Sequence, residues 1–213
     1  HLVGRGGRDG AVTDRQPGLP TTLAPVGGWW GEVEHNVTEA IFTPIQNPAT
    51  AVAALLSGDV DMINPVPIQD AARLQQSDGV DVLQGIEARV IMLGFDQQAG
   101  ASESGAGASD IFLDAKAREA VAKAINVPAI LQTIMRGNAE PASQLVSPAM
   151  RGFSEANAAP LGCDVDAARA AAEAAGIGGA SVDLKCPNNR YLNDEAVCQA
   201  VTGMLAQIGL EVT

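Results

Sequence analysis

The chain has 213 residues, of which 46% are hydrophobic but only 3% aromatic, so a core has to come mainly from Ala, Val, Leu and Ile. Its formal net charge of −12 disfavours nucleic acids and anionic membrane surfaces as partners, because both are bound through clustered Lys and Arg. No run of about 18 apolar residues occurs, so the sequence predicts no membrane-spanning helix.

The first half of the chain predicts short strands and two helices. Glycine and proline break residues 1–31 into extended pieces. Asn47 predicts an N-cap for a helix that starts at Pro48 and ends before Gly58, and a second helix is expected at 70–76. Further strands are expected at 39–45, 60–63, 80–83 and 89–95.

The second half is mainly helical. Residues 97–110 are small and polar, which is typical of an exposed loop or hinge. Helices are expected at 114–125, 128–135, 164–175 and 194–208, with Asp164 capping the third. Residues 181–186 predict a strand, and another begins at Leu210, so we expect further residues to follow Thr213. The alternation of strands and helices indicates an α/β protein with a mainly parallel or mixed sheet.

Signals of catalysis are weak. His1 and His35 are the only histidines, so a Ser-His-Asp triad or a histidine metal site would have to use one of them. The early glycines lack the third glycine of a dinucleotide-binding loop, where Asp9 stands instead. Adjacent acids such as Asp194 and Glu195 are expected to complement a helix dipole. We therefore predict no catalytic residue, no metal site and no cofactor.

Two of the three cysteines stand at the two ends of a candidate site. Cys186 ends a predicted strand and Cys198 lies in the helix that follows. A disulfide between them would add about 3 kcal/mol of stability in an oxidising compartment. The alternative is two buried free thiols. The spacing excludes a Cys-x-x-Cys metal or redox site.

The loop between these cysteines connects a strand to a helix, where open α/β sheets place their ligands. Arg190 offers a fork of donors that fits a carboxylate, and the helix start adds free N–H groups. In the alternative interpretation, Arg190 pairs with Asp194 or Glu195 and only holds the loop. The candidate ligand-binding residues are Arg190, Asn188, Asn189, Tyr191 and Asn193.

Six segments form a pattern in order along the chain, namely Val3–Gly7, Trp29–Gly31, Pro44–Thr50, Val52–Asp61, Leu93–Asp96, and Lys116–Ala120 with Ala124–Asn126. Together they resemble the extracytoplasmic solute-binding proteins of ABC transporters, family 5, which include dipeptide-, oligopeptide-, nickel- and opine-binding proteins. The likeness departs from the family pattern at Gly7-Arg8, where Pro-Tyr is usual, and at Cys163-Asp164-Val165, where Tyr-Asp-Pro is usual.

The resemblance implies a type II periplasmic binding protein with two lobes that close over a ligand, of which this chain is a part. Residues 1–92 would belong to the first lobe and 93–213 would begin the other. In dipeptide-binding relatives an arginine at the position of Arg190 holds the carboxylate of the peptide. The acidic residue that binds the peptide's amino group is expected in a later segment.

The function expected from the resemblance is extracytoplasmic capture of a peptide-like solute and its delivery to an ABC transporter membrane permease. We expect a monomer that is periplasmic or extracytoplasmic, lipid-anchored in some relatives, with no nucleic-acid partner. Two alternatives stay open. The same fold would bind a metal chelate, haem, a sugar or an opine, or the chain would be a hydrolase that uses acidic residues.

Overall fold

The computed structural model describes residues 10–28, 30, 35–85, 87–97, 110–148, 150–188 and 190–213. The chain divides into two compact units, His1–Val66 and Pro67–Thr213. This division falls before the predicted lobe boundary after residue 92, and the assignment of 1–92 and 93–213 to two lobes stays a prediction. Several sequence-based assignments lie outside the described residues, namely His1, Val3–Gly7 and Gly7-Arg8, Trp29 and Gly31, most of 97–110, and Asn189.

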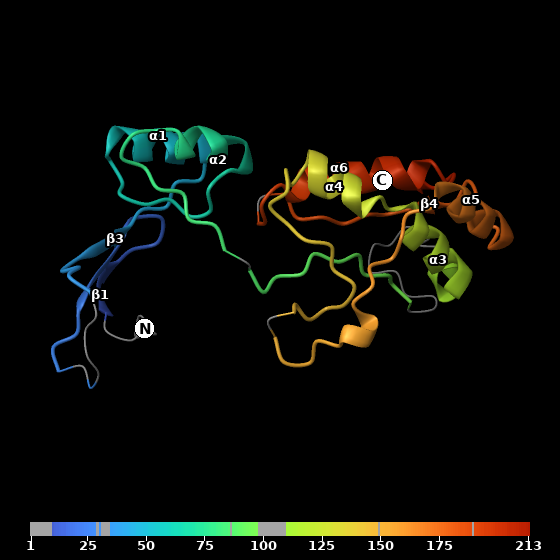
Figure 1. Cartoon of the computed structure of the whole chain (residues 1–213), viewed down its shortest axis with the longest axis horizontal. Helices are drawn as coiled ribbons and strands as arrows, with labels where there is room; N and C mark the ends of the chain where they lie inside the picture. The colour runs from blue at the N-terminus through green and yellow to red at the C-terminus, as the bar shows by residue number, and fades with distance from the viewer. Residues whose placement is uncertain are drawn as a thin grey trace. The chain divides into compact units, whose positions relative to one another are not determined.

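The first unit contains an antiparallel sheet of three strands in the order β1-β2-β3 (Figure 1). The strands are β1 (Gly10–Arg15), β2 (Thr21–Pro25) and β3 (Ala40–Phe42). The turn between β1 and β2 needs Gly18, whose φ of 78° lies in the left-handed region. The strand predicted at 39–45 is confirmed only over Ala40–Phe42.

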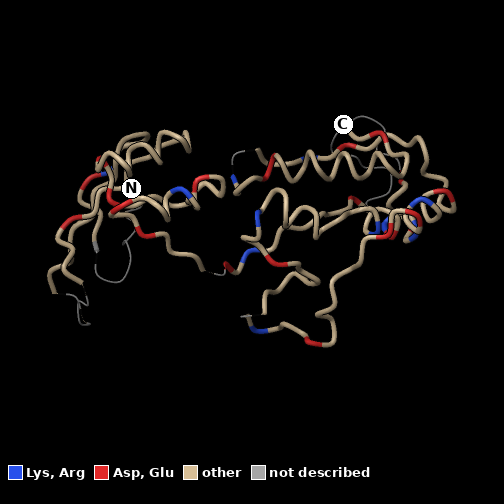
Figure 2. Tube along the Cα trace, turned by 45° about the horizontal axis from the view of Figure 1, so that its top comes forward, with Lys and Arg blue, Asp and Glu red and all other residues tan. Residues whose placement is uncertain are grey.

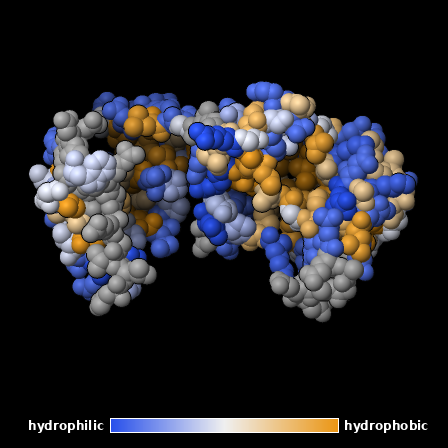
Figure 3. Space-filling view, turned by 90° about the horizontal axis from the view of Figure 1, so that it is seen from below, coloured by the Kyte–Doolittle hydropathy of each residue, from blue (hydrophilic) through white to orange (hydrophobic). Residues whose placement is uncertain are grey.

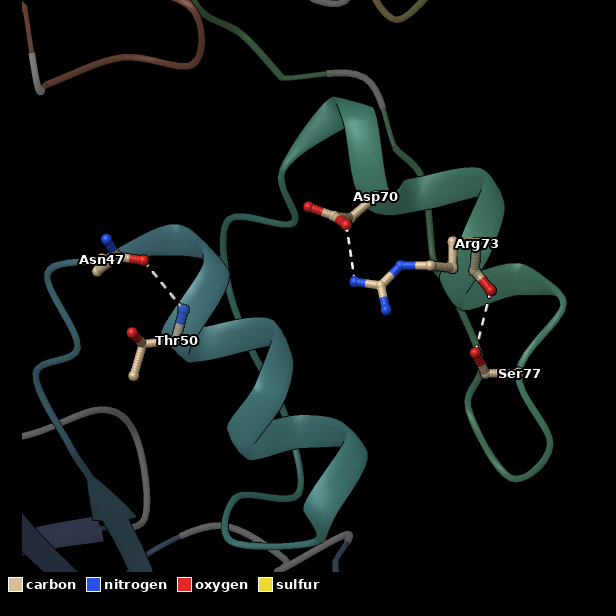
Figure 4. A network of polar contacts seen from close by, with 5 residues as sticks. All are labelled: Asn47, Thr50, Asp70, Arg73 and Ser77. Carbon is tan, nitrogen blue, oxygen red and sulfur yellow. Dashed lines mark hydrogen bonds and ion pairs between the residues drawn. The ribbon is translucent and has the colours of Figure 1, made fainter.

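Helix α1 (Pro48–Ser57) follows this sheet and forms as its sequence predicts. The Oδ1 of Asn47 accepts a hydrogen bond of 3.0 Å from the N–H of Thr50, as Figure 4 shows. Gly58 ends the helix with a φ of 80°. The N-cap at Asn47 and the end at Gly58 are both confirmed.

The second unit is mainly helical. At its start, helix α2 (Ile68–Gln75) carries an ion pair of 2.8 Å between Arg73 and Asp70 (Figure 4). Asp164 caps α5 (Val165–Ala174) as predicted, and α4 (Val127–Thr133), capped by Asn126, begins one residue earlier than the sequence indicates. In chain order the elements are α2 (Ile68–Gln75), the 3-10 helix η1 (Asp110–Leu113), α3 (Ala115–Ala124), α4 (Val127–Thr133), the 3-10 helix η2 (Glu155–Asn157), α5 (Val165–Ala174), β4 (Ser181–Val182), α6 (Asp194–Ala206) and β5 (Glu211–Val212).

The core of the second unit lies among α3, α5 and α6. Helix α3 packs beside α5 (Figure 1), and the buried residues at their contact are mostly alanines, which allow close approach of the two helices. Leu205 and Val201 add the buried face of α6. The predicted core of Ala, Val, Leu and Ile is confirmed here. Strands β4 and β5 pair in parallel next to this core.

Three predicted strands are wrong, namely those at 60–63, 80–83 and 89–95. A strand needs a neighbour that accepts its backbone hydrogen bonds. The N–H of Val60 instead bonds the carbonyl of Ala54 at the end of α1, and the N–H of Val80 closes a turn onto Ser77. Leu83 is 94% exposed and Met92 67% exposed, so neither residue adds much to a buried core. The strand predicted at 181–186 is shortened to β4.

The charge of the chain is spread along its length. Figure 2 shows acidic residues, in red, in both units and outnumbering the basic ones, in blue. Among the described residues, no helix is both long enough and apolar enough to cross a membrane.

Candidate functional site

The segment between β4 and α6 is closed by a disulfide. Cys186 and Cys198 are joined with an S–S distance of 2.05 Å and a Cα–Cα distance of 6.4 Å. The bond ties the residues that follow β4 to the second turn of α6. The third cysteine, Cys163, is a free thiol. The loop that contains the candidate ligand-binding residues is therefore anchored at both ends.

Asp194 shapes the loop from inside. Its side chain is buried, and its Oδ2 accepts backbone N–H groups of Tyr191 at 2.9 Å and Arg190 at 3.0 Å. Its Oδ1 accepts the N–H of Glu195 at 2.8 Å. These bonds, first of all that from Tyr191, hold the pKa of the Asp194 carboxyl below its usual range, because they favour the ionised form. The carboxylate thus serves as the internal anchor of the loop.

Asn193 connects the loop to the rest of the second unit. It lies in the left-handed region with a φ of 55°, at the residue before α6. Its Nδ2 donates a hydrogen bond of 2.9 Å to the carbonyl of Ile134, at the end of α4. Asn193 therefore positions the loop, and its role as a ligand-binding residue stays a prediction.

Arg190 does not form the ion pair that the alternative interpretation requires. Asp194 contacts the backbone N–H of Arg190, not its guanidinium, and Glu195 accepts a hydrogen bond from Gln199. Among the described residues, Arg190 forms no ion pair. Its Cζ lies 5.1 Å from the centroid of the Tyr191 ring. Its donors are available for a carboxylate.

A pocket of about 290 Å³ lies beside the disulfide and opens widely to solvent. Asn188 lines it, together with both half-cystines and Glu195, but Arg190 and Tyr191 do not. Of the described candidate residues, Asn188 thus lines this pocket, whereas Arg190, Tyr191 and Asn193 do not. Asn189 lies outside the described residues.

Sequence reasoning missed Arg89. Its Cζ lies 4.8 Å from the centroid of the same Tyr191 ring, and it forms an ion pair of 2.6 Å with Glu87. Sequence analysis placed Arg89 at the start of a strand, and nothing in the sequence links it to the distant Tyr191. Its segment is held by a hydrogen bond of 2.9 Å from Gln84 to Asn138.

The described part of the chain holds no cluster of three His, Cys, Asp or Glu side chains that would suit a metal ion. The site offers donors from arginine and aromatic surface, which suit an anionic organic solute.

The sequence also matches a family model over residues 11–213, that of the bacterial extracellular solute-binding proteins, family 5, middle part. The chain belongs to this family. Family 5 proteins bind solutes and are not enzymes, so the hydrolase alternative is discarded.

Similar proteins agree with this assignment. The glutathione-binding protein GsiB of Shigella flexneri serotype 5b is 25% identical over 187 residues, which are 86% of this chain and 34% of that protein. The chain therefore spans about a third of this relative's length.

Two solved structures have the same fold. The periplasmic binding protein DppA from Helicobacter pylori, in complex with the peptide STSA, matches with a TM-score of 0.77 and 17% identity over 96% of this chain and 37% of its own. The binding protein AgaA of A. tumefaciens R10, in complex with agropinic acid, matches with a TM-score of 0.74 and 23% identity over 96% of this chain and 40% of its own. The predicted periplasmic-binding-protein fold is confirmed.

Proposed function

We propose that this family 5 chain binds the carboxylate of a peptide-like solute at Arg190 and that the intact protein delivers the solute to an ABC importer. The observation that carries the proposal is the combination of a guanidinium that forms no ion pair with the described residues and a loop fixed by Asp194 and a disulfide. A fixed loop keeps the donors of Arg190 in place and so lowers the entropy lost on binding.

The preference for a peptide-like solute rests on the chemistry of the site. The guanidinium of Arg190 can donate two parallel hydrogen bonds to a carboxylate. The neighbouring ring of Tyr191 can contact apolar atoms of the solute. The proteins named above bind glutathione, a tetrapeptide and agropinic acid, which are small molecules with acidic groups. We place the peptide first and an opine second because the site contains an arginine and the described residues contain no metal cluster.

Capture and delivery would follow the two-lobe mechanism of this class of protein. The solute favours the closed arrangement of the two lobes, and the closed form is presented to the permease. The protein would act as a monomer in the periplasm or another extracytoplasmic space, where an oxidising environment also suits the disulfide.

Arg190→Ala in the intact protein tests the proposal. Removing one partner of a charged, directional contact costs at least about 1.4 kcal/mol, so we expect affinity to fall tenfold or more. Calorimetric titration with glutathione, with the peptide STSA and with agropinic acid measures the effect for the solute that binds.

The matched control is Arg169→Ala. Arg169 lies on α5 and its Nε donates to the carbonyl of Gln207, at the opposite end of α6 from the loop. It removes the same charge without touching the loop. Equal affinity of wild type and Arg190→Ala for every solute that binds, or binding of none of the three by wild type, would contradict the proposal.

A further inference from the structure

Two arginines share one aromatic ring in the second unit. Both the Cζ of Arg89 and the Cζ of Arg190 lie within 5.1 Å of the ring centroid of Tyr191. The first comes from the extended segment before Leu93 and the second from the loop before α6, so tertiary packing brings them together. Two guanidinium groups over one ring give this part of the second unit a local positive charge, which an anion would stabilise.

Glu87 already shows how a carboxylate binds Arg89. Its Oε1 lies 2.6 Å from Arg89, and both side chains are exposed, at 63% for Glu87 and 44% for Arg89. Exposed ion pairs are weak and exchange readily with other carboxylates. Another carboxylate can therefore displace Glu87 from Arg89, whereas Arg190 forms no ion pair among the described residues.

We infer that Arg89 is a second anion-binding residue and that the solute carries two carboxylates, one held by Arg190 and one that displaces Glu87 from Arg89. This inference rests on the proposed function and defines its solute class as a diacidic peptide or peptide-like molecule.

The spacing fits a solute of this size. Carboxylates on residues two or three positions apart in an extended peptide are about 7–10 Å apart. Two guanidinium carbons that both lie within 5.1 Å of one ring centroid can be spanned by such a molecule. The ring of Tyr191 would then lie under the part of the solute between its two acidic groups.

Hydrogen bonds also hold the two arginine segments against common neighbours. Asn193, three residues after Arg190, bonds the carbonyl of Ile134, and Gln84 bonds Asn138 in the loop that follows. The Nδ2 of Asn138 in turn bonds the carbonyl of Met135. These hydrogen bonds hold the segments of Arg89 and Arg190 in place within the second unit.

The test uses two pairs of probes with the intact protein. Glutathione and the peptide SESA each carry two carboxylates on residues two positions apart, whereas the glycyl ethyl ester of glutathione and the peptide SQSA each lack one of them. Calorimetric titration gives the ratio of affinities within each pair. We expect wild type to bind at least one diacid about threefold more tightly than its matched monoacid, and Arg89→Gln to reduce that ratio to about one.

Glu87→Gln is the second variant, and its effect has the opposite sign. When Glu87 no longer competes, Arg89 binds the second carboxylate of the solute more tightly. Affinity for the preferred diacid should therefore rise about threefold, and affinity for the monoacid should stay unchanged. A role of Arg89 in folding alone would give neither the loss of the ratio nor this rise.

The outcomes separate the two proposals. If wild type shows no preference for either diacid, or if Arg89→Gln leaves the ratio unchanged, the two-carboxylate inference is wrong. Arg190→Ala tests the proposed function independently, because it should weaken the diacid and the monoacid alike when the shared carboxylate is the one at Arg190.

Discussion

The two compact units are stabilised in different ways. In the first unit the strands β1, β2 and β3 are held by backbone pairing and turns, and among its described residues only Val52 belongs to the buried hydrophobic set. Phe42 and Ile41 on β3 remain 59% and 60% exposed. In the second unit α3, α5 and α6 bury a continuous core. Figure 3 shows hydrophobic residues, in orange, at the molecular surface.

This contrast shows that turns and helix caps can define helices and strands without a large buried core. Turns and caps are enough to specify the elements of the first unit, but they bury little apolar surface. In the second unit, burial of apolar side chains fixes the position of α6 and hence of the loop before it. The candidate site therefore depends on the buried core of the second unit.

The largest effect is expected from opening the core of the second unit. Leu205→Ala removes a side chain that is 4% exposed and should lower the free energy of unfolding by about 2–5 kcal/mol. Phe42→Ala in β3 should cost less than about 1 kcal/mol because its side chain is largely exposed. Urea unfolding of the intact protein measures both. A similar cost for the two variants would show that β3 is covered in the intact protein, and the contrast between the units would then disappear.

The disulfide gives the second contrast. Cys186→Ser with Cys198→Ser opens a loop of 12 positions and should lower the free energy of unfolding by about 3 kcal/mol, because the unfolded chain gains conformational freedom. Cys163→Ser is the matched control, since Cys163 is free. Unfolding in urea without reductant gives both values. Equal stability of the double variant and the control would mean that the bond does not constrain the unfolded chain.

The sequence predicted those features that are encoded within a few residues. Asn47 and Asp164 marked the starts of α1 and α5 because an N-cap bonds an N–H three residues ahead. The loop of Arg190 was also found in this way, since it depends on a short segment, and the family resemblance rests on six such segments in order.

The rest depends on partners that are distant in the sequence. Residues 60–63, 80–83 and 89–95 have the composition of strands, but β-structure also requires a neighbouring strand. The contact of Arg89 with Tyr191 arises only when the extended segment packs beside the loop. No local pattern could have placed Arg89 in the site, and no local pattern excluded the ion pair between Arg190 and Asp194.

The helix caps should have similar effects in both units, because they act locally. Asn47→Ala in the first unit and Asp164→Ala in the second each leave one backbone N–H without its acceptor, and each should cost about 1 kcal/mol of unfolding free energy. Gln46→Ala, at the exposed neighbour of Asn47, is the control and should change little. Thermal unfolding checks the three variants. A cost at Asp164 several times that at Asn47 would mean that cap strength depends on the surrounding core.

The smallest effect is expected from the carboxylate of Asp194, and it depends on pH. Because the folded state lowers the pKa of this carboxyl, ionised Asp194 stabilises the loop at neutral pH, and this contribution is lost as pH falls below about 4. Asp194→Asn removes the charge, so its unfolding free energy should fall less steeply than that of wild type over the same acidic range.

The same variant also tests the loop directly at neutral pH. An asparagine amide accepts fewer backbone hydrogen bonds than a carboxylate, so the N–H groups of Arg190 and Tyr191 should exchange with solvent faster in Asp194→Asn. Asp166→Asn controls for the loss of one negative charge, since Asp166 lies on α5 and pairs with Arg169. If exchange at residues 190 and 191 stays at the wild-type rate, the loop is held by the disulfide and by Asn193 instead. These two links, and not the carboxylate of Asp194, would then fix the position of Arg190.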